Sequence, residues 1–219
     1  MKKQKNSGFV EFCGGLKYIV EPPVKNNITE IVFILDSSGS MHGYEKDVTG
    51  SFNALINSQK QLDGTVYVTT VLFNSKQNCL HDRINIADIS PMGPKDYTTQ
   101  GNTALLDAVG DTIRHISTIH RYIRPEDLPQ NTIIVINTDG MENASSKYDF
   151  EEVKYMVEEK QEKEGWEFIF LGAEIDSFDL GSQIGVKTGH IFDCIKGCFG
   201  TEDDEDLLDE EIKAIRTRY

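Results

Sequence analysis

Two continuous apolar segments that each run into an aspartate constrain the fold of this chain more than any other feature. The first runs from Ile31 to Leu35 and meets Asp36. The second runs from Thr132 to Asn137, with Ile133 to Ile136 as its apolar centre, and is followed by Thr138 and Asp139. Short runs of branched apolar residues are typical of strands that are buried on both faces of a parallel sheet. Since parallel strands end at the same edge, we expect both carboxylates in the crevice where doubly wound sheets bind ligands.

The rest of the chain alternates between strand and helix patterns, which predicts helices on both faces of the sheet. We therefore predict an α/β doubly wound fold with a mostly parallel six-stranded sheet and one antiparallel edge strand. The other predicted strands are 65–73, 77–86 (the antiparallel edge), 167–171 and 186–192. Predicted helices span 44–61 and 176–184, begin near Thr103 and Asp149, and close the chain around Leu208, Ile212 and Ile215.

A length of 219 residues fits one domain with short appendages. We expect residues 1–26 to form an N-terminal extension with a short edge strand at 16–20. Residues 27–193 should form the domain, and residues 194–219 an acidic segment and a C-terminal helix packed on it. No apolar run approaches the length of a membrane span and no signal-peptide pattern is present, so we expect a cytoplasmic location.

The formal net charge of -14 argues against nucleic acids and anionic membranes as partners, because both favour basic surfaces. Eight acidic residues lie between Glu202 and Glu211, without a basic one, so this stretch carries more than half of the net charge. We expect the stretch to be a solvated loop before the last helix.

The turn after the first apolar segment, Asp36 to Ser40, holds one carboxylate and three hydroxyls around Gly39. These oxygens suit a hard cation such as Mg²⁺. The alternative is a polar turn that caps the next helix, since Asp and Ser are also the preferred capping residues. Thr103 opens a helix directly after Gly101-Asn102, so its hydroxyl can reach the same crevice.

The order of these residues along the chain resembles the metal-ion-dependent adhesion site (MIDAS) of von Willebrand factor type A (VWA) domains. The motif parts are Asp36-x-Ser38-x-Ser40, then the distant Thr103, then Asp139. The resemblance covers about residues 27–193 and is greatest to the small stand-alone intracellular domains of bacteria and their phages. The segments that carry it are Gly101 to Ala108, Thr138 to Ser145 and Gly165 to Ala173.

The resemblance implies that Ser38 and Ser40 coordinate the cation through their hydroxyls, and that Thr103 does so directly or through water. Asp36 and Asp139 would hold bound waters around it and balance its charge. The implied cofactor is Mg²⁺, with Mn²⁺ or Ca²⁺ as alternatives, and the implied partner is a protein that offers Asp or Glu to the metal.

We therefore expect a non-catalytic, Mg²⁺-dependent protein-binding module. The alternative is a metal-assisted hydrolase or phosphatase on a similar sheet. Phosphatases of that kind use a second Asp two residues after the first, and here that position is Ser38. No Gly-rich phosphate loop ending in Gly-Lys-Ser/Thr is present either.

Other residues are weaker candidates. His42, Tyr97 and Met92 lie on the expected ligand-binding side and are predicted partner contacts, although His42 also fits a solvated position at a helix start. Asp107 fits helix-start electrostatics better than metal contact. A zinc site has the spacing of His190, Cys194 and Cys198 in its favour but lacks a fourth ligand, which Cys79 or His81 would have to supply.

Overall fold

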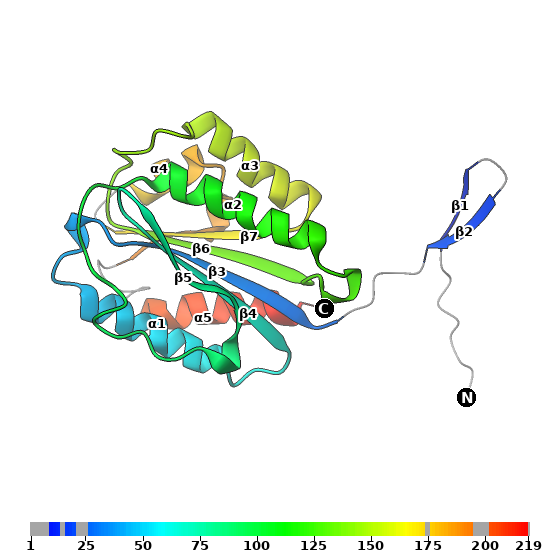
Figure 1. Ribbon diagram of the computed structural model, residues 1–219, viewed down its shortest axis with the longest axis horizontal. Helices are drawn as coiled ribbons and strands as arrows, with labels where there is room; N and C mark the ends of the chain where they lie inside the picture. Colours follow the sequence, from blue (N-terminus) through cyan, green and yellow to red (C-terminus); the bar gives the residue numbers. More distant parts are fainter. Residues whose placement is uncertain (1–8, 14–15, 21–25, 174–175, 195–201, 219) are drawn as a thin grey trace.

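The computed structural model describes residues 9–13, 16–20, 26–173, 176–194 and 202–218. Its centre is a six-stranded sheet in the order β5-β4-β3-β6-β7-β8 (Figure 1). Every neighbouring pair is parallel except β4 and β5, which confirms the predicted fold class. The strands are β3 (Ile28–Asp36), β4 (Thr65–Phe73), β5 (Gln77–Asn85), β6 (Asn131–Thr138), β7 (Glu167–Gly172) and β8 (Ile191–Asp193).

Helices cover both faces of this sheet (Figure 1). One face carries α1 (Glu45–Gln59) and α5 (Glu202–Thr217); the other carries α2 (Leu105–Tyr122), α3 (Phe150–Lys163) and α4 (Ser177–Gln183). Alternate residues of β3 enter the two cores, with Ile31 and Phe33 on the α1 side and Val32 and Ile34 on the α2 side. Burial on both faces therefore explains why the strand is continuously apolar.

The strand predicted at 16–20 is present as β2 (Leu16–Val20), but it does not extend the six-stranded sheet. It pairs antiparallel with β1 (Phe9–Cys13) in a separate two-stranded sheet. No helix in the described part of the chain combines the length and the apolar character that a membrane span requires.

Two predictions for the C-terminal part are wrong. Of the strand predicted at 186–192, only the end forms a strand, as β8. The residues before it form turns: the Val186 N–H bonds to the Gly181 carbonyl, and a 3₁₀ turn follows at Thr188–His190. The acidic stretch from Glu202 is not a loop but the beginning of α5. Acidic residues are favourable in the first turn of a helix, where they complement the positive end of its dipole.

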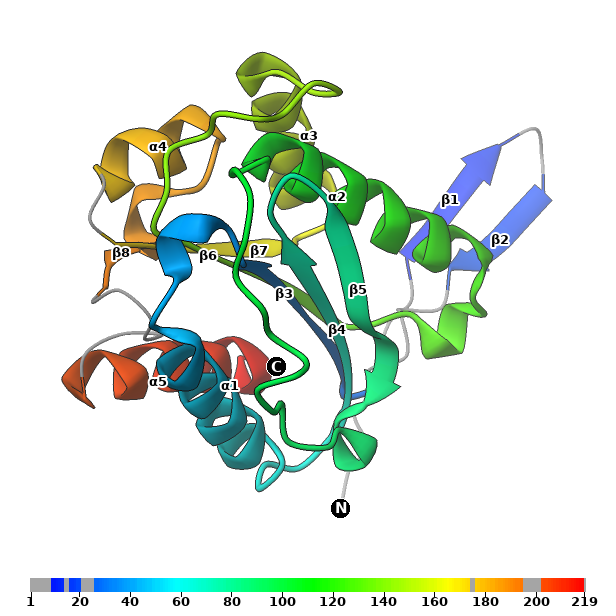
Figure 2. The same cartoon turned by 60° about the vertical axis from the view of Figure 1, so that its left-hand side comes forward.

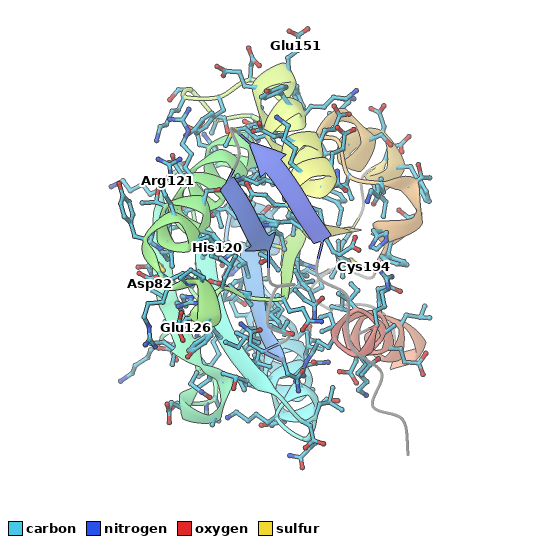
Figure 3. All side chains as sticks on the ribbon, turned by 90° about the vertical axis from the view of Figure 1, so that its right-hand side faces the viewer. Asp82, His120, Arg121, Glu126, Glu151 and Cys194 are labelled. Carbon is cyan, nitrogen blue, oxygen red and sulfur yellow. The ribbon has the colours of Figure 1, made fainter. Side chains whose placement is uncertain are left out.

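A buried carboxylate closes the amino end of the sheet, away from the expected site. Glu30 is fully buried in β3, and its Oε2 lies 3.3 Å from Arg83 Nε and 2.9 Å from His120 Nε2. Figure 3 shows His120 and the neighbouring Arg121 near the end of α2. Since a buried carboxylate is tolerated when it is paired, this cluster has a structural role. The carboxyl end of the sheet therefore remains as the place for a ligand site.

Candidate metal centre

The two aspartates end neighbouring strands. Leu35 of β3 pairs with Asn137 of β6, so Asp36 and Asp139 both lie just past this pair at one edge of the sheet. Asp36 is fully buried. Its Oδ1 accepts the Ser38 N–H at 2.7 Å and its Oδ2 accepts the Thr138 hydroxyl at 2.6 Å. Both oxygens are thus engaged within the protein, and the carboxylate holds the turn and the end of β6 together.

The serine hydroxyls of the turn lie together beside the second carboxylate. Ser38 Oγ and Ser40 Oγ are 2.9 Å apart, and Ser40 Oγ donates to Asp139 Oδ1 at 2.7 Å. The turn passes close to the segment that precedes α2, because the Gly39 N–H bonds to the Gly101 carbonyl at 2.9 Å. A Cβ on residue 39 would lie 3.3 Å from that carbonyl, so glycine permits this approach.

Thr103 brings the third hydroxyl to the same place. Its side chain is 3% exposed. A Cβ on residue 140 would lie 2.9 Å from Thr103 Oγ1 and 3.6 Å from Ser40 Oγ. Hydroxyls from two different loops therefore approach one point of the backbone at Gly140. All five residues proposed from the sequence, Asp36, Ser38, Ser40, Thr103 and Asp139, lie in one cluster.

The electrostatics of the cluster fit a bound cation. Burial raises the pKa of the Asp36 carboxyl, and the nearby Asp139 carboxylate raises this pKa further, whereas the hydrogen bonds from Thr138 and Ser38 lower it. A divalent cation would relieve the repulsion between the two carboxylates. The donor set of three hydroxyls and two carboxylates consists of oxygens only, as Mg²⁺ prefers.

The zinc alternative finds no support in the described residues, which contain no group of three His, Cys, Asp or Glu side chains able to hold a metal. The Cys194 thiol donates to the Gly172 carbonyl at 3.4 Å, and His190 Nδ1 lies 3.9 Å from Glu211 Oε1. Cys198 lies outside the described residues.

The loop after Asp139 contributes two residues that sequence reasoning did not assign. Asn143 binds Thr103 twice: its Oδ1 accepts the Thr103 N–H at 3.0 Å, and its N–H donates to the Thr103 carbonyl at 3.1 Å. The Glu142 carboxylate accepts the Leu106 N–H at 2.9 Å, in the first turn of α2. These contacts join the two segments that supply Asp139 and Thr103. The same two stretches carry the family resemblance in the sequence, which is the only signal that could have indicated them.

Asp107 has a more specific role than the predicted helix-start electrostatics. Its carboxylate accepts three backbone N–H groups of the same loop, from Ser146, Lys147 and Tyr148, at 2.9–3.1 Å. It therefore positions the loop and contributes no oxygen to the cluster of hydroxyls.

Two of the three predicted partner contacts are wrong, because their side chains are buried. Tyr97 is 0% exposed, and its hydroxyl donates to the Asp36 carbonyl. Met92 is 4% exposed and belongs to the core on the α1 side. Both lie in the long segment between β5 and α2, which packs its apolar side chains inward. The third, His42, has an 83% exposed side chain at the surface beside the cluster.

The segment between β5 and α2 also forms one side of a cavity. Figure 2 shows this segment running alongside the turn that follows β3, and the Gln100 N–H bonds to the Ser37 carbonyl at 2.9 Å. The cavity measures about 420 Å³ and opens between this segment and the start of α1. Its lining consists of His42, Glu45, Lys46, Thr49, Pro94, Tyr97, Thr98 and Thr99.

Comparison with protein families places residues 28–214 in a single family model, vWA-TerF-like, described as the vWA domain found in the C terminus of TerF. A search of curated protein sequences found no significant match.

Solved structures share the fold at low sequence identity. The vWF domain of the type V pili tip protein Mfa5 from Porphyromonas gingivalis has a TM-score of 0.59 at 10% identity, over 84% of this chain and 95% of that one. Proximal thread matrix protein 1 from the mussel byssus has a TM-score of 0.55 at 15% identity, over 87% of this chain. This chain spans only 46% of the mussel protein. A second structure of the mussel protein, with a zinc-occupied MIDAS motif, has a TM-score of 0.56 at 14% identity, over 87% of this chain and 45% of that one.

Proposed function

Because the chain belongs to the vWA-TerF-like family of von Willebrand factor type A domains, we propose that it is a non-catalytic, Mg²⁺-dependent protein-binding module. The observation that carries the proposal is the convergence of Ser38, Ser40 and Asp139 within hydrogen-bond distance, with Thr103 beside them. A mussel relative with this fold holds zinc in its MIDAS motif, which supports a divalent cation in the corresponding motif here.

We propose that the hydroxyl residues hold the cation and that the carboxylates balance its charge. Ser38, Ser40 and Thr103 would hold it through neutral hydroxyls. Each carboxylate oxygen of Asp36 already accepts a hydrogen bond, from the Ser38 N–H or the Thr138 hydroxyl, so we propose that Asp36 acts through its charge and through bound water. When bound, a cation with few charged ligands supplies a Lewis-acidic position that a carboxylate from a partner can fill.

The chain's net charge favours this mode of binding over direct attraction of acidic partners. With a formal net charge of -14, the protein surface repels acidic ligands on average. The cluster also contains the carboxylates of Asp36 and Asp139, so we propose that it recognises a partner's Asp or Glu through the cation. Binding should depend on the metal and be lost when a chelator removes it.

Calorimetric titration with Mg²⁺ tests the site directly, with Mn²⁺ and Ca²⁺ titrated in parallel to identify the preferred cation. We expect binding in the wild type and none in Asp36→Ala or in the double variant Ser38→Ala with Ser40→Ala. Ser182→Ala, at an exposed serine of α4, is the matched control and should bind normally. Unchanged Mg²⁺ binding by the double variant, with a folded circular dichroism spectrum, would refute the assignment.

Two further measurements test the proposed activity. A pull-down from the native cell should retain protein partners with Mg²⁺ and release them with a chelator. Phosphatase and ATPase assays with Mg²⁺ or Mn²⁺ should show no turnover. Turnover that disappears in Asp36→Ala would favour the metal-assisted hydrolase instead.

A further inference from the structure

A large apolar side chain stands in solvent beside the candidate metal centre. Met141 is 74% exposed and follows Gly140, where an added Cβ would lie 2.9 Å from Thr103 Oγ1 and 3.6 Å from Ser40 Oγ. Consecutive Cα atoms are about 3.8 Å apart, so Met141 lies within one residue of the cluster. A single exposed apolar residue is ordinary in itself. Its place at the rim of a ligand site gives it significance.

The backbone on the far side of Met141 is firmly held. Glu142 accepts four hydrogen bonds, two of them from backbone N–H groups of its own loop and one from Leu106. Asn143 binds Thr103 through both its side chain and its N–H. When a partner covers Met141, only its side chain and not the backbone that carries it has to be ordered, which limits the entropic cost of the contact.

The start of α1, which follows the turn that holds Ser38 and Ser40, has different chemistry. There Glu45 accepts the Thr99 hydroxyl at 2.7 Å and the Gly43 N–H at 2.9 Å, at the wall of the 420 Å³ cavity. The hydrogen bond from Thr99 lowers the pKa of the Glu45 carboxyl, and the one from Gly43 also lowers it. The cluster therefore has an apolar neighbour in Met141 and charged neighbours at the start of α1, where Lys46 lines the same cavity as Glu45.

Building on the proposed function, we infer that the partner offers an acidic side chain to the metal and, close to it in sequence, an apolar side chain that packs against Met141. The partner motif is thus one Asp or Glu with Leu, Ile, Met or Phe close to it in sequence.

An apolar contact beside the cation would let the site select among partners that carry an acidic residue. A single carboxylate on an exposed Mg²⁺ provides little selectivity, because any exposed Asp or Glu could fill the position. Methionine is flexible and polarizable and packs against aliphatic and aromatic side chains of various shapes. Removing its contact should weaken the binding of a matching peptide by about tenfold, the loss expected when a partly buried apolar side chain is truncated.

Random peptides displayed on phage provide the test. The immobilised full chain is loaded with Mg²⁺, and bound phage are eluted with a chelator, so that only metal-dependent binders are sequenced. We expect Asp or Glu in nearly every selected peptide, with an apolar residue within two positions of it. The apolar preference should disappear with Met141→Ser as bait. Tyr122→Ser, at an exposed aromatic at the far end of α2, is the control and should leave it unchanged.

The outcomes separate the inference from the proposed function on which it rests. Acidic peptides without apolar neighbours, or an apolar preference that survives in Met141→Ser, would overturn the inference and leave the proposed function intact. Selected peptides without acidic residues, or no metal-dependent binders from a bait that binds Mg²⁺ in the calorimeter, would overturn both.

Discussion

Replacing Glu142 with Gln tests whether the loop after Asp139 is held as the structure shows. The carboxylate accepts the Ala144 and Ser145 N–H groups on Oε1, at 2.9 and 2.7 Å. It accepts the Leu106 N–H and the Ser145 hydroxyl on Oε2, at 2.9 and 2.8 Å. Gln has nearly the same shape, but one of its two terminal atoms is a donor. It can therefore keep only one of these two pairs of hydrogen bonds.

The expected loss follows from which hydrogen bonds the glutamine side chain cannot make. With its oxygen toward the loop, Gln sets an amide N–H against the Leu106 N–H, while the Ser145 hydroxyl can rotate to accept. One backbone bond is lost and the others lose their charge assistance. A hydrogen bond to a charged group contributes about 1.5–3 kcal/mol, and Glu142 is only half-buried, so we expect the free energy of unfolding to fall by about 2 kcal/mol.

Urea unfolding with a chelator present measures this loss without a contribution from bound metal. Glu151→Gln is the matched control: Glu151, at the start of α3, is exposed and projects away from the body of the protein (Figure 3). It removes the same charge, together with a favourable position in the first turn of α3, and should lower the free energy of unfolding by less than about 1 kcal/mol. A Glu142→Gln protein as stable as the control would show that these hydrogen bonds do not hold the loop.

Three other substitutions give equally direct results. Gly140→Ala places a Cβ 2.9 Å from Thr103 Oγ1 and should weaken Mg²⁺ binding in the calorimeter by at least about tenfold; normal affinity would contradict the packing of Thr103. Tyr97→Phe removes the hydroxyl that donates to the Asp36 carbonyl and should lower the free energy of urea unfolding by about 1 kcal/mol; an equally stable variant would show that this bond contributes nothing. Arg216→Met removes three hydrogen bonds from α5, to the Gln59 carbonyl and side chain and to the Asp63 carbonyl, and should cost about 3 kcal/mol in the same assay. A loss under about 1 kcal/mol would mean that these three hydrogen bonds contribute little to holding α5 in place.

Much of the fold was predictable because burial leaves a local signature in sequence. Both central strands are covered on two faces, so their residues are continuously apolar, as in β3 and β6. The predicted secondary structure was wrong where the residues of a segment suited two kinds of local structure equally well. The stretch from Val186 to Phe192 has strand-forming composition, but only Ile191–Asp193 meets the edge of β7. The acidic stretch before Leu208 suits a solvated loop and a helix start equally well.

The cluster of hydroxyls and carboxylates was also accessible from sequence, because each residue that forms it follows a recognisable structural boundary. Asp36 and Asp139 end buried strands, and Thr103 precedes a strongly periodic helix. Parallel pairing then brings the strand ends to one edge whatever the intervening loops contain.

The sequence by itself therefore determined the layered fold, which follows from strand burial and from the direction of parallel strands, and it indicated the five candidate site residues, whose order resembles the MIDAS motif. Only the tertiary structure decided which neighbouring side chains reach the surface. Tyr97 and Met92 lie in a segment without periodicity, and their burial depends on how that segment packs against β3 and α1. Met141 is exposed, whereas Glu142 and Asn143 bind α2 and Thr103, contacts between residues 36 and 40 positions apart that no local pattern records.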